Sequence, residues 1–327
     1  GKGEPFDREG LAGMSGETLQ VYFLGTAGAL PTPLRNPPCI MVRRGSDSLL
    51  FDCGEGTQQQ MMRSRTGFLV DAIFVTHWHA DHFLGIAGLV QTLSFIGRKD
   101  PLPIYGPAWV HEAVSAIRAL SRFSIKFSLS SVQMGHGSEI RFNGYSVRAF
   151  TTDHGMESLG YVLAEDSRPG RFNRERAIEL GVPPGPLFGR IQRGEMVCTL
   201  KDGISIHVSP EDVMGPPRPG RTIVYTGDTR PVHDRIAEIT TSPDLLIHDA
   251  TYDDECRDRA AEVFHATAGE AGEAARVLQA RILALVHISS RYTSAAGHIR
   301  DATKEFSGTV IAPSDLEFLE LPFRDDD

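Results

Sequence analysis

The chain has 327 residues, with 41% hydrophobic and 23% charged side chains, which is ordinary usage for one large globular core or two modest ones. No run of eighteen apolar residues occurs, which excludes a membrane-spanning helix. The formal net charge of −9 excludes an evenly basic nucleic-acid-binding surface, because phosphates are bound by Lys and Arg, so any basic surface must be local.

The N-terminal residues do not have the sequence pattern of a targeting segment. Residues 1–10 lack an apolar stretch and are not a signal peptide, so we expect residues 1–13 to be an added or loose tail and 14–327 to form a single domain. Four scattered cysteines form no Cys-x-x-Cys pair, which predicts reduced thiols, mostly in the core of a cytoplasmic protein. They are Cys39, Cys53, Cys198 and Cys256.

Strand-like apolar runs alternate with helical segments along the chain. The predicted strands are 19–24, 49–53, 72–76, 147–151, 222–227, 244–248, 282–287 and 309–311. The predicted helices are 82–97, 108–122, 231–238 and 268–280. In the first helix, apolar residues recur at helical spacing and predict a face packed on a sheet. This order, in two halves, predicts an α/β fold, most simply an αββα sandwich.

Residues 76–82 read Thr-His-Trp-His-Ala-Asp-His directly after a predicted strand. Extended residues two apart share a face, so His77 and His79 project the same way, whereas the neighbours Asp81 and His82 point apart and suit a second ion. Imidazole and carboxylate groups are ligands for zinc, and iron or manganese is also compatible with them. The loop therefore predicts part of a two-metal site.

Two metals need more ligands than this loop supplies. Three further candidates, His154, Asp228 and His287, each follow an apolar run, where sites in α/β proteins collect. With them the inventory is five histidines and two aspartates, enough for two ions that share a bridging carboxylate.

Residues 168–193 form a locally basic segment, with six arginines against two glutamates. Its four prolines and four glycines are typical of an extended protrusion. By composition alone, an ordinary solvated loop with arginines for solubility is favoured over an RNA clamp.

The 76–82 loop resembles the signature of the metallo-β-lactamase superfamily, and the chain from about Leu19 to Phe318 resembles the ribonuclease Z family, endonucleases that remove 3′ trailers from precursor tRNA. Four further segments carry this resemblance. They are residues 23–36 (Phe-Leu-Gly-Thr through Arg-Asn), 51–58 (Phe-Asp-Cys-Gly-Glu-Gly-Thr-Gln), 185–189 (Gly-Pro-Leu-Phe-Gly) and 287–292 (His-Ile-Ser-Ser-Arg-Tyr).

The resemblance implies a metallo-β-lactamase αββα sandwich with a protruding tRNA-binding arm inserted at about 157–208. It also implies two Zn²⁺ per subunit, with Mn²⁺ or Fe as alternatives. The implied ligands are His77, His79 and His154 for one ion, Asp81, His82 and His287 for the other, and Asp228 between them.

The same resemblance implies roles in catalysis and binding. Asp81 would act as general base beside a metal-activated hydroxide, and His265 would protonate the departing 3′ oxygen after the discriminator base, leaving a tRNA 3′-hydroxyl and a trailer 5′-phosphate. Asp52 and Asp249 would support the site. The implied substrate contacts are Arg35, Asn36, Gly185, Pro186, Arg190, Arg193, Ser289 and Arg291. The partners implied are precursor tRNA and a second subunit, whose site receives the tRNA held by the arm.

The chain departs from the family pattern at two positions. Asp249 stands where the family commonly has glutamate, which shortens any support for His265 by one methylene. Pro33 stands where many members have lysine, in the loop to which handling of the CCA end is attributed.

Three alternatives stay open. A superfamily member acting on a small cyclic phosphodiester or a thioester would need no arginine-bearing arm. A redox di-iron protein typically has a carboxylate at the position of His79 and an added flavin domain. A non-catalytic nucleic-acid-binding subunit would not need an intact ligand set.

The remaining aromatic and histidine residues receive structural interpretations. We expect Trp78 to brace the metal loop. His111, His136, His207, His233 and His298 fit no ligand pattern, and we expect each at the surface or in a local hydrogen bond.

Overall fold

The computed structural model describes residues 17–120, 125–201 and 203–324, so the expected tail at 1–13 lies outside the described residues. The chain divides into two compact units. The first contains the described residues up to Ser138, Arg148–Val162 and those from Ile223 onward, and the second contains Glu139–Val147 and Leu163–Thr222. The long segment of the second unit, 163–222, begins and ends later than the arm expected at about 157–208, and residues 159–162 are buried strand residues of the first unit.

A first sheet of seven strands lies within the described residues. Its members are β1 (Leu19–Gly25), β2 (Cys39–Arg44), β3 (Asp47–Phe51), β4 (Ala72–Phe74), β5 (Leu102–Gly106), β6 (Leu129–Gln133) and β16 (Phe318–Glu320). The order is β16-β1-β2-β3-β4-β5-β6, antiparallel from β16 to β3 and parallel from β3 to β6. Since β3, β4 and β5 run in parallel, the loops after them meet at one edge of the sheet.

The second sheet also has seven described strands. They are β7 (Glu139–Phe142), β8 (Tyr145–Thr151), β9 (Leu159–Glu165), β12 (Thr222–Tyr225), β13 (Leu245–Asp249), β14 (Ile282–Val286) and β15 (Thr309–Ile311). The order is β15-β14-β13-β12-β9-β8-β7, and β12 to β15 pair in parallel. The carboxyl ends of β12, β13 and β14 therefore also share an edge.

The described helices are short. They are α1 (Thr57–Arg63), α2 (Ala80–Phe83), α3 (Gly85–Phe95), α4 (Val110–Ala119), α5 (Arg174–Glu179), α6 (Pro186–Gln192), α7 (Pro210–Val213), α8 (His233–Ala237), α9 (Arg257–Glu262), α10 (Ala268–Val277) and α11 (Ala296–Glu305), with one 3₁₀ turn at Asp254–Cys256. The helix predicted at 82–97 is divided into α2 and α3. Its predicted apolar face is confirmed for Ile86, Leu89, Val90 and Leu93, which are buried, whereas Leu84 and Ile96 at its two ends are exposed. No described helix is long and apolar enough to span a membrane.

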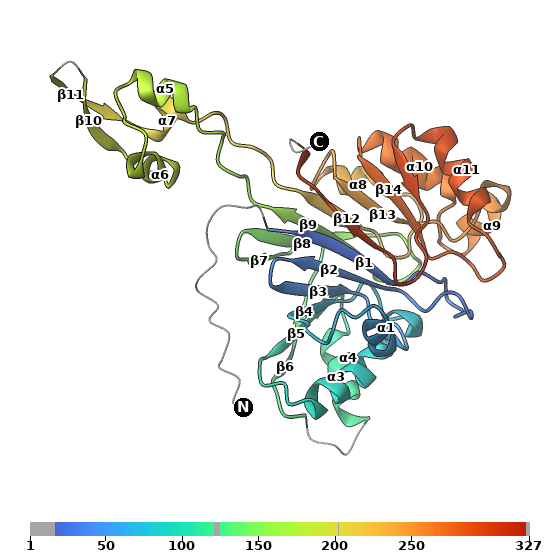
Figure 1. Cartoon of the computed structure of the whole chain (residues 1–327). Helices are drawn as coiled ribbons and strands as arrows, with labels where there is room; N and C mark the ends of the chain where they lie inside the picture. Colours follow the sequence, from blue (N-terminus) through green and yellow to red (C-terminus); the bar gives the residue numbers. More distant parts are fainter. Residues whose placement is uncertain (1–16, 121–124, 202, 325–327) are drawn as a thin grey trace. The chain divides into compact units, whose positions relative to one another are not determined.

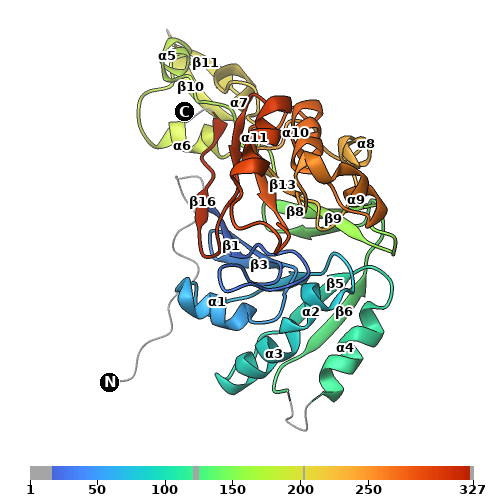
Figure 2. The same ribbon diagram turned by 90° about the vertical axis from the view of Figure 1, so that its right-hand side faces the viewer.

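The first unit is an αββα sandwich, as the sequence predicted. Helices α1, α3 and α4 cover the outer face of the first sheet, and α8, α10 and α11 cover that of the second (Figures 1 and 2). Between the sheets, the rings of Phe51 and Tyr161 lie 5.9 Å apart. The Tyr161 hydroxyl donates a 2.6 Å hydrogen bond to the carbonyl of Val75. The second sheet therefore holds the chain at the point where β4 leads into the 76–82 loop.

The second unit has a small core of its own. The hairpin of β10 (Val197–Lys201) and β11 (Ile204–Val208) packs with α5, α6 and α7. The buried residues of this core are Ala177, Val182, Ile191, Val197, Val208 and Val213. Two connecting segments lead to it and pair through the bridges Arg168 to Arg218 and Phe172 to Met214. The second unit is therefore a packed structure and not a flexible loop that carries arginines.

Candidate metal centre

The residues of the 76–82 loop are positioned by backbone bonds to neighbouring strands. The Val75 amide donates to the carbonyl of Tyr105 in β5, and the amide of Leu159 donates to the carbonyl of Thr76. The chain then turns into α2, whose first turn carries Asp81 and His82. Both sheets thus fix the direction in which the loop's histidines point.

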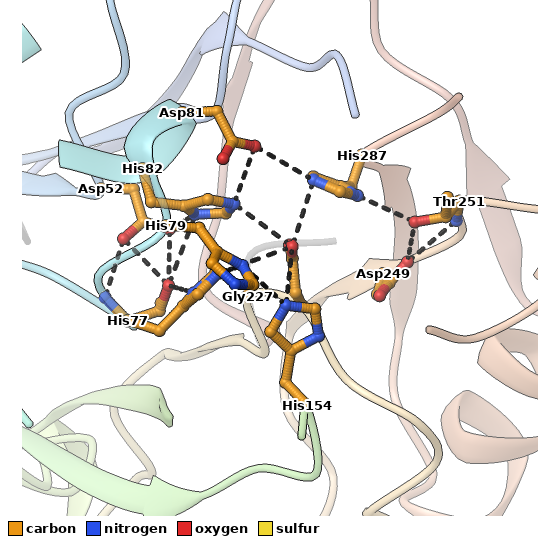
Figure 3. Close-up of polar contacts among 12 residues, drawn as sticks. Asp52, His77, His79, Asp81, His82, His154, Gly227, Asp249, Thr251 and His287 are labelled. Carbon is orange, nitrogen blue, oxygen red and sulfur yellow. Dashed lines mark hydrogen bonds and ion pairs between the residues drawn. The ribbon is translucent and has the colours of Figure 1, made fainter. Parts of the chain in front are cut away.

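The structure brings all seven predicted ligands together (Figure 3). One group consists of His77, His79, His154 and Asp228, and another of Asp81, His82 and His287, and within each group the ligand atoms lie within 4.8 Å of one another. Asp228 lies between the two groups. Its Oδ2 is 3.3 Å from Nε2 of both His82 and His287, and 3.6 Å from Nε2 of His154. This is the place of a bridging carboxylate.

The donor atoms themselves fit a pair of cations. Nε2 of His82, Nε2 of His287 and Oδ1 of Asp228 are buried, and none has a hydrogen-bond partner among the described residues. Buried polar atoms are normally paired, since an unpaired one loses its hydration without replacement. Bound divalent ions would satisfy these atoms, so the residues present fit the two-metal centre that the sequence predicted.

The other ring nitrogen of four of these histidines is already occupied. Nδ1 of His82 lies 2.7 Å from Asp52 Oδ2, Nδ1 of His77 lies 3.0 Å from the Thr76 hydroxyl, and Nδ1 of His154 lies 2.9 Å from the Phe264 carbonyl. Nδ1 of His287 lies 2.8 Å from the Thr251 hydroxyl. Such partners fix the ring orientation and leave Nε2 for a metal.

Asp52 supports this arrangement from below the loop, as the sequence predicted. It is fully buried and accepts bonds from the Thr76 amide, the Thr76 hydroxyl and the Tyr225 hydroxyl. Gly227, which precedes Asp228, has a φ of 59°, and a Cβ there would lie 2.7 Å from Thr76 Cγ2. Glycine is therefore needed where the chain passes closely behind the metal loop.

The charges of the ligands suit cation binding. Burial opposes ionisation of Asp81, but the polar attraction of the neighbouring His287 and His82 rings outweighs burial and lowers its pKa. Burial of His77 lowers its pKa below 6.5, which keeps the imidazole neutral and able to coordinate. Both residues are thus in their metal-binding protonation states near neutral pH.

His265 lies beside the ligand set, paired with Asp249. Its Nδ1 is 2.8 Å from Asp249 Oδ2, so the shorter aspartate still reaches the ring. Burial lowers the pKa of His265, but the adjacent Asp249 carboxylate outweighs it and raises the pKa to about 9. Asp249 also accepts from the amides of Thr229 and Thr251. The pair holds a protonated imidazole next to the metal ligands.

Thr251 is a functional residue that the sequence analysis missed. Its hydroxyl donates to Asp249 Oδ1 at 2.7 Å and lies 3.1 Å from Nδ1 of His265 and 2.8 Å from Nδ1 of His287. Thr251 therefore connects His287 to Asp249 (Figure 3), the partner of His265. The signal was its place in the His-Asp-Ala-Thr segment, two residues after Asp249.

The predicted substrate residues of the first unit are divided between two cavities. Thr32 to Arg35 and Ser289 line one of about 340 Å³, whereas Asn36 lines another of about 450 Å³. The Arg35 guanidinium is turned toward the protein and donates to the Thr26 hydroxyl and the Pro313 carbonyl. Arg291 is exposed, and its Nη1 lies 3.3 Å from the Cys256 sulfur. Arg35 thus shapes a cavity wall, whereas Arg291 presents charge to solvent.

The predicted residues of the second unit lie around α6. Gly185 precedes the helix, and Pro186 is its first residue. Arg190 forms a 2.7 Å ion pair with Glu195, and Arg193 lies 3.5 Å from the same carboxylate. The basic segment at 168–193 ends two residues before this glutamate, so its charge is partly neutralised within the unit.

The structural interpretations of the other residues are mostly confirmed. Trp78 braces the metal loop through a 2.8 Å bond from Nε1 to the Ala108 carbonyl. The expectation for His298 is wrong, since the ring is fully buried, with neither nitrogen hydrogen-bonded among the described residues, and lies against Tyr292 at 4.6 Å. His298 lies on the face of α11 that packs against the core. All four cysteines are free, but Cys198 is exposed and Cys256 half-buried, so only Cys39 and Cys53 are core residues.

Comparison with known proteins identifies the family. Residues 32–265 match the Metallo-beta-lactamase superfamily. A protein named Ribonuclease Z from Methanosarcina acetivorans is 51% identical over 307 residues, covering 94% of this chain and 99% of the relative. Another of that name, from Methanosarcina mazei, is 48% identical over 309 residues, covering 94% and 100%.

A solved structure shares the fold over nearly the whole chain. The crystal structure of human tRNase Z, short form, is 25% identical, with a TM-score of 0.66, and the match covers 93% of this chain and 100% of the human one. The seven-residue ligand set, the αββα sandwich and these relatives agree: the chain belongs to the metallo-β-lactamase superfamily and, within it, to the ribonuclease Z family.

Proposed function

We propose that the chain is a zinc-dependent endoribonuclease that removes 3′ trailers from precursor tRNA by cutting the phosphodiester after the discriminator base. The observation that carries the proposal is the Asp228-centred ligand set with the His265–Asp249 pair beside it. The relatives named Ribonuclease Z, about 50% identical, support RNA as the substrate. Two Zn²⁺ suit the histidine-rich donors, and Mn²⁺ or Fe are alternatives.

Bound ions would lower the pKa of a water molecule and stabilise charge on the phosphoryl oxygens. The chain's own residues orient and move protons. Asp81, whose pKa is lowered, accepts the proton of the attacking water as general base. That oxygen bonds to phosphorus, and the bond from phosphorus to the 3′ oxygen of the discriminator nucleotide breaks.

His265 gives its proton to that departing 3′ oxygen. An alkoxide is a poor leaving group, so a positioned acid contributes roughly 10²–10⁴ in rate. Asp249 keeps the ring protonated and Thr251 holds the carboxylate in place. The products are a tRNA 3′-hydroxyl and a trailer 5′-phosphate.

The proposal includes a homodimer in which the second unit of one subunit holds tRNA for the site of the other. The exposed Arg190 and Arg193 and the start of α6 at Gly185 and Pro186 are the proposed RNA contacts there. In the first unit, the guanidinium of the exposed Arg291 can donate bidentate hydrogen bonds to a phosphate, beside Ser289. The four free cysteines suit a reducing compartment such as the cytoplasm.

The test is cleavage of a precursor tRNA carrying a 3′ trailer, with and without a chelator, with the product end mapped to a single nucleotide. We expect metal-dependent cutting beside the discriminator. An intact transcript together with hydrolysis of a small phosphodiester would contradict the proposal and favour a superfamily enzyme that acts on another ester.

A further inference from the structure

Trp109 connects β5 to α4 in an unusual conformation. Its φ is 77°, in the left-handed region that bulky side chains rarely adopt and that glycine adopts without strain. The strained backbone does not bring the Trp109 side chain into the core, since 48% of the residue is exposed. Strained residues of this kind persist where the surroundings hold them and cluster at binding and catalytic sites.

The surroundings that hold Trp109 are the metal-ligand loops. The preceding residue, Ala108, makes two backbone hydrogen bonds. Its carbonyl accepts from Trp78 Nε1 at 2.8 Å, and the Ala108 amide donates to Glu157 Oε1 at 3.0 Å. Trp78 lies between His77 and His79, and Glu157 follows His154 by three residues. Ala108, directly before Trp109, is thus tied through both of its backbone polar groups to chain segments that carry predicted metal ligands.

The exposed indole continues an aromatic cluster. The ring centroids of Trp109 and Trp78 are 5.8 Å apart and those of Trp109 and Phe83 6.3 Å apart, both in edge-on contacts. Trp78 lies between His77 and His79 in the chain, and Phe83 directly follows His82. The two rings against which Trp109 packs therefore come from the segment that carries four of the predicted metal ligands.

We propose that Trp109 is a stacking platform for an unpaired base of the 3′ trailer. This inference rests on the proposed function. Single-stranded RNA is held by bases stacked on aromatic side chains, without need for a particular sequence.

The direction of the RNA follows from the ligand groups. His265, the donor to the leaving 3′ oxygen, belongs to a cluster with Asp249, His287 and Asp228, whereas His79 clusters with His77, His154 and the same Asp228. The tRNA nucleotide that carries the 3′ oxygen therefore lies toward His265. We place the trailer toward His79, because the adjacent Trp78 contacts Trp109.

The test compares Trp109→Gly and Trp109→Phe with the parent enzyme on precursor tRNAs whose first three trailer nucleotides are replaced, one at a time, by abasic ones. Glycine relieves the backbone strain, which offsets part of the packing lost with the ring, and thermal unfolding of the variant is measured alongside. Phe95→Ala, an 83% exposed aromatic at the end of α3, is the matched control.

For Trp109→Gly we expect KM for the intact precursor to rise about tenfold with kcat little changed. The loss of kcat/KM on the precursor should exceed the loss of kcat/KM on a small diester by the same factor. Trp109→Phe should return KM for the precursor most of the way to the parent value. The difference between Trp109→Gly and the parent should disappear on at least one abasic precursor.

Three outcomes would overturn the inference: an unchanged KM, an equal loss on the precursor and the small diester, or an equal loss on all abasic precursors. An unchanged KM with an altered oligomeric state would assign the ring to subunit contact instead. Failure of the parent enzyme to cut any precursor would count against the proposed function itself, so the two failures are distinguishable.

Discussion

At the scale of single residues, the proton on His265 depends on one carboxylate. Asp249 is fully buried and lies 2.8 Å from the ring, and it raises the pKa of His265 to about 9 against the effect of burial. An acid acts only while it is protonated, so the proposed step is available below this pKa and lost above it. The positive charge of bound ions opposes protonation and moves the loss to pH 9 or lower.

His265→Ala should lower kcat for precursor tRNA by roughly 10²–10⁴ and remove the alkaline fall from the pH profile. Asp249→Asn should shift that fall to lower pH, because the ring loses the charge that holds its proton. The measurement is kcat from pH 6 to 10 for the parent and both variants. An alkaline fall that persists unchanged in His265→Ala would assign it to another group.

The metal ligands could be predicted from the sequence because each follows an apolar strand, and strand ends converge in this fold. Thr251, Thr76 and Tyr225 could not, since hydroxyl residues are common and their partners come together only in three dimensions. The inward turn of Arg35 likewise depends on Pro313, 278 residues away.

At the scale of elements, the close approach of α3 to the loop after β3 supports the metal centre. Gly85 begins α3, its amide donates to the Cys53 carbonyl, and a Cβ there would lie 1.9 Å from the Gly54 carbonyl oxygen. Cys53 in turn donates to the carbonyl of His82. Any displacement of α3 is therefore passed to a metal ligand.

Gly85→Ala should lower the free energy of unfolding by about 1–3 kcal/mol or more and weaken metal binding. Gly135→Ala is the control, because its Cβ would meet nothing within 4 Å and its φ is ordinary. Thermal unfolding and zinc titration would check both. Equal stability of the two variants would show that the loop after β3 can move without cost.

The part of the second unit that contains its small core, residues 169–217, should be removable. Deletion of 168–193 alone would leave Val197, Val208 and Val213 without the rest of their core. Deletion of 169–217, closed by a short glycine linker between the bridged Arg168 and Arg218, avoids this. We expect it to abolish cleavage of precursor tRNA while hydrolysis of a small phosphodiester continues, and equal loss of both would contradict a tRNA-gripping role.

Sequence periodicity predicted eight of the strands and the helices around α3, α4, α8 and α10, but it missed the seven-residue β9 and the ten-residue α11 together with several shorter elements. Strand β5 contains Pro103, and β2 follows two prolines, features that usually exclude a strand. The hairpin of β10 and β11 exposes Leu200 and Ile204, so its alternation is blurred. These strands depend on pairing with distant segments, which local pattern does not encode.

At the scale of the whole molecule, metal binding and stability should be linked. Nε2 of His82, Nε2 of His287 and Oδ1 of Asp228 are buried at the strand ends and have no hydrogen-bond partner in the described part of the chain. Ions that bind the folded chain there stabilise it by about 2.7 kcal/mol at a free concentration one hundred times Kd. Zinc should raise the melting temperature and a chelator should lower it, as measured by calorimetry. Asp228→Ala should show little response to either.

The proposed dimer predicts complementation. A His265→Ala subunit has an intact second unit, and a subunit lacking 169–217 has an intact metal site. Each alone should cut precursor tRNA poorly, but co-expressed subunits should recover activity through mixed dimers. Recovery absent in a confirmed mixed dimer would place the RNA-holding unit and the cutting site in one subunit.

The pairing of Trp78 with Trp109 has an optical consequence. They are the two tryptophans of the chain, and their ring centroids lie 5.8 Å apart beside the metal loop. The tryptophan fluorescence of the protein, excited selectively over its seven tyrosines, therefore originates at this one place, and ion or RNA binding near it can be followed without an added label. Unfolding of the second unit, which has no tryptophan, should leave that emission unchanged, so the two units can be observed separately in one sample.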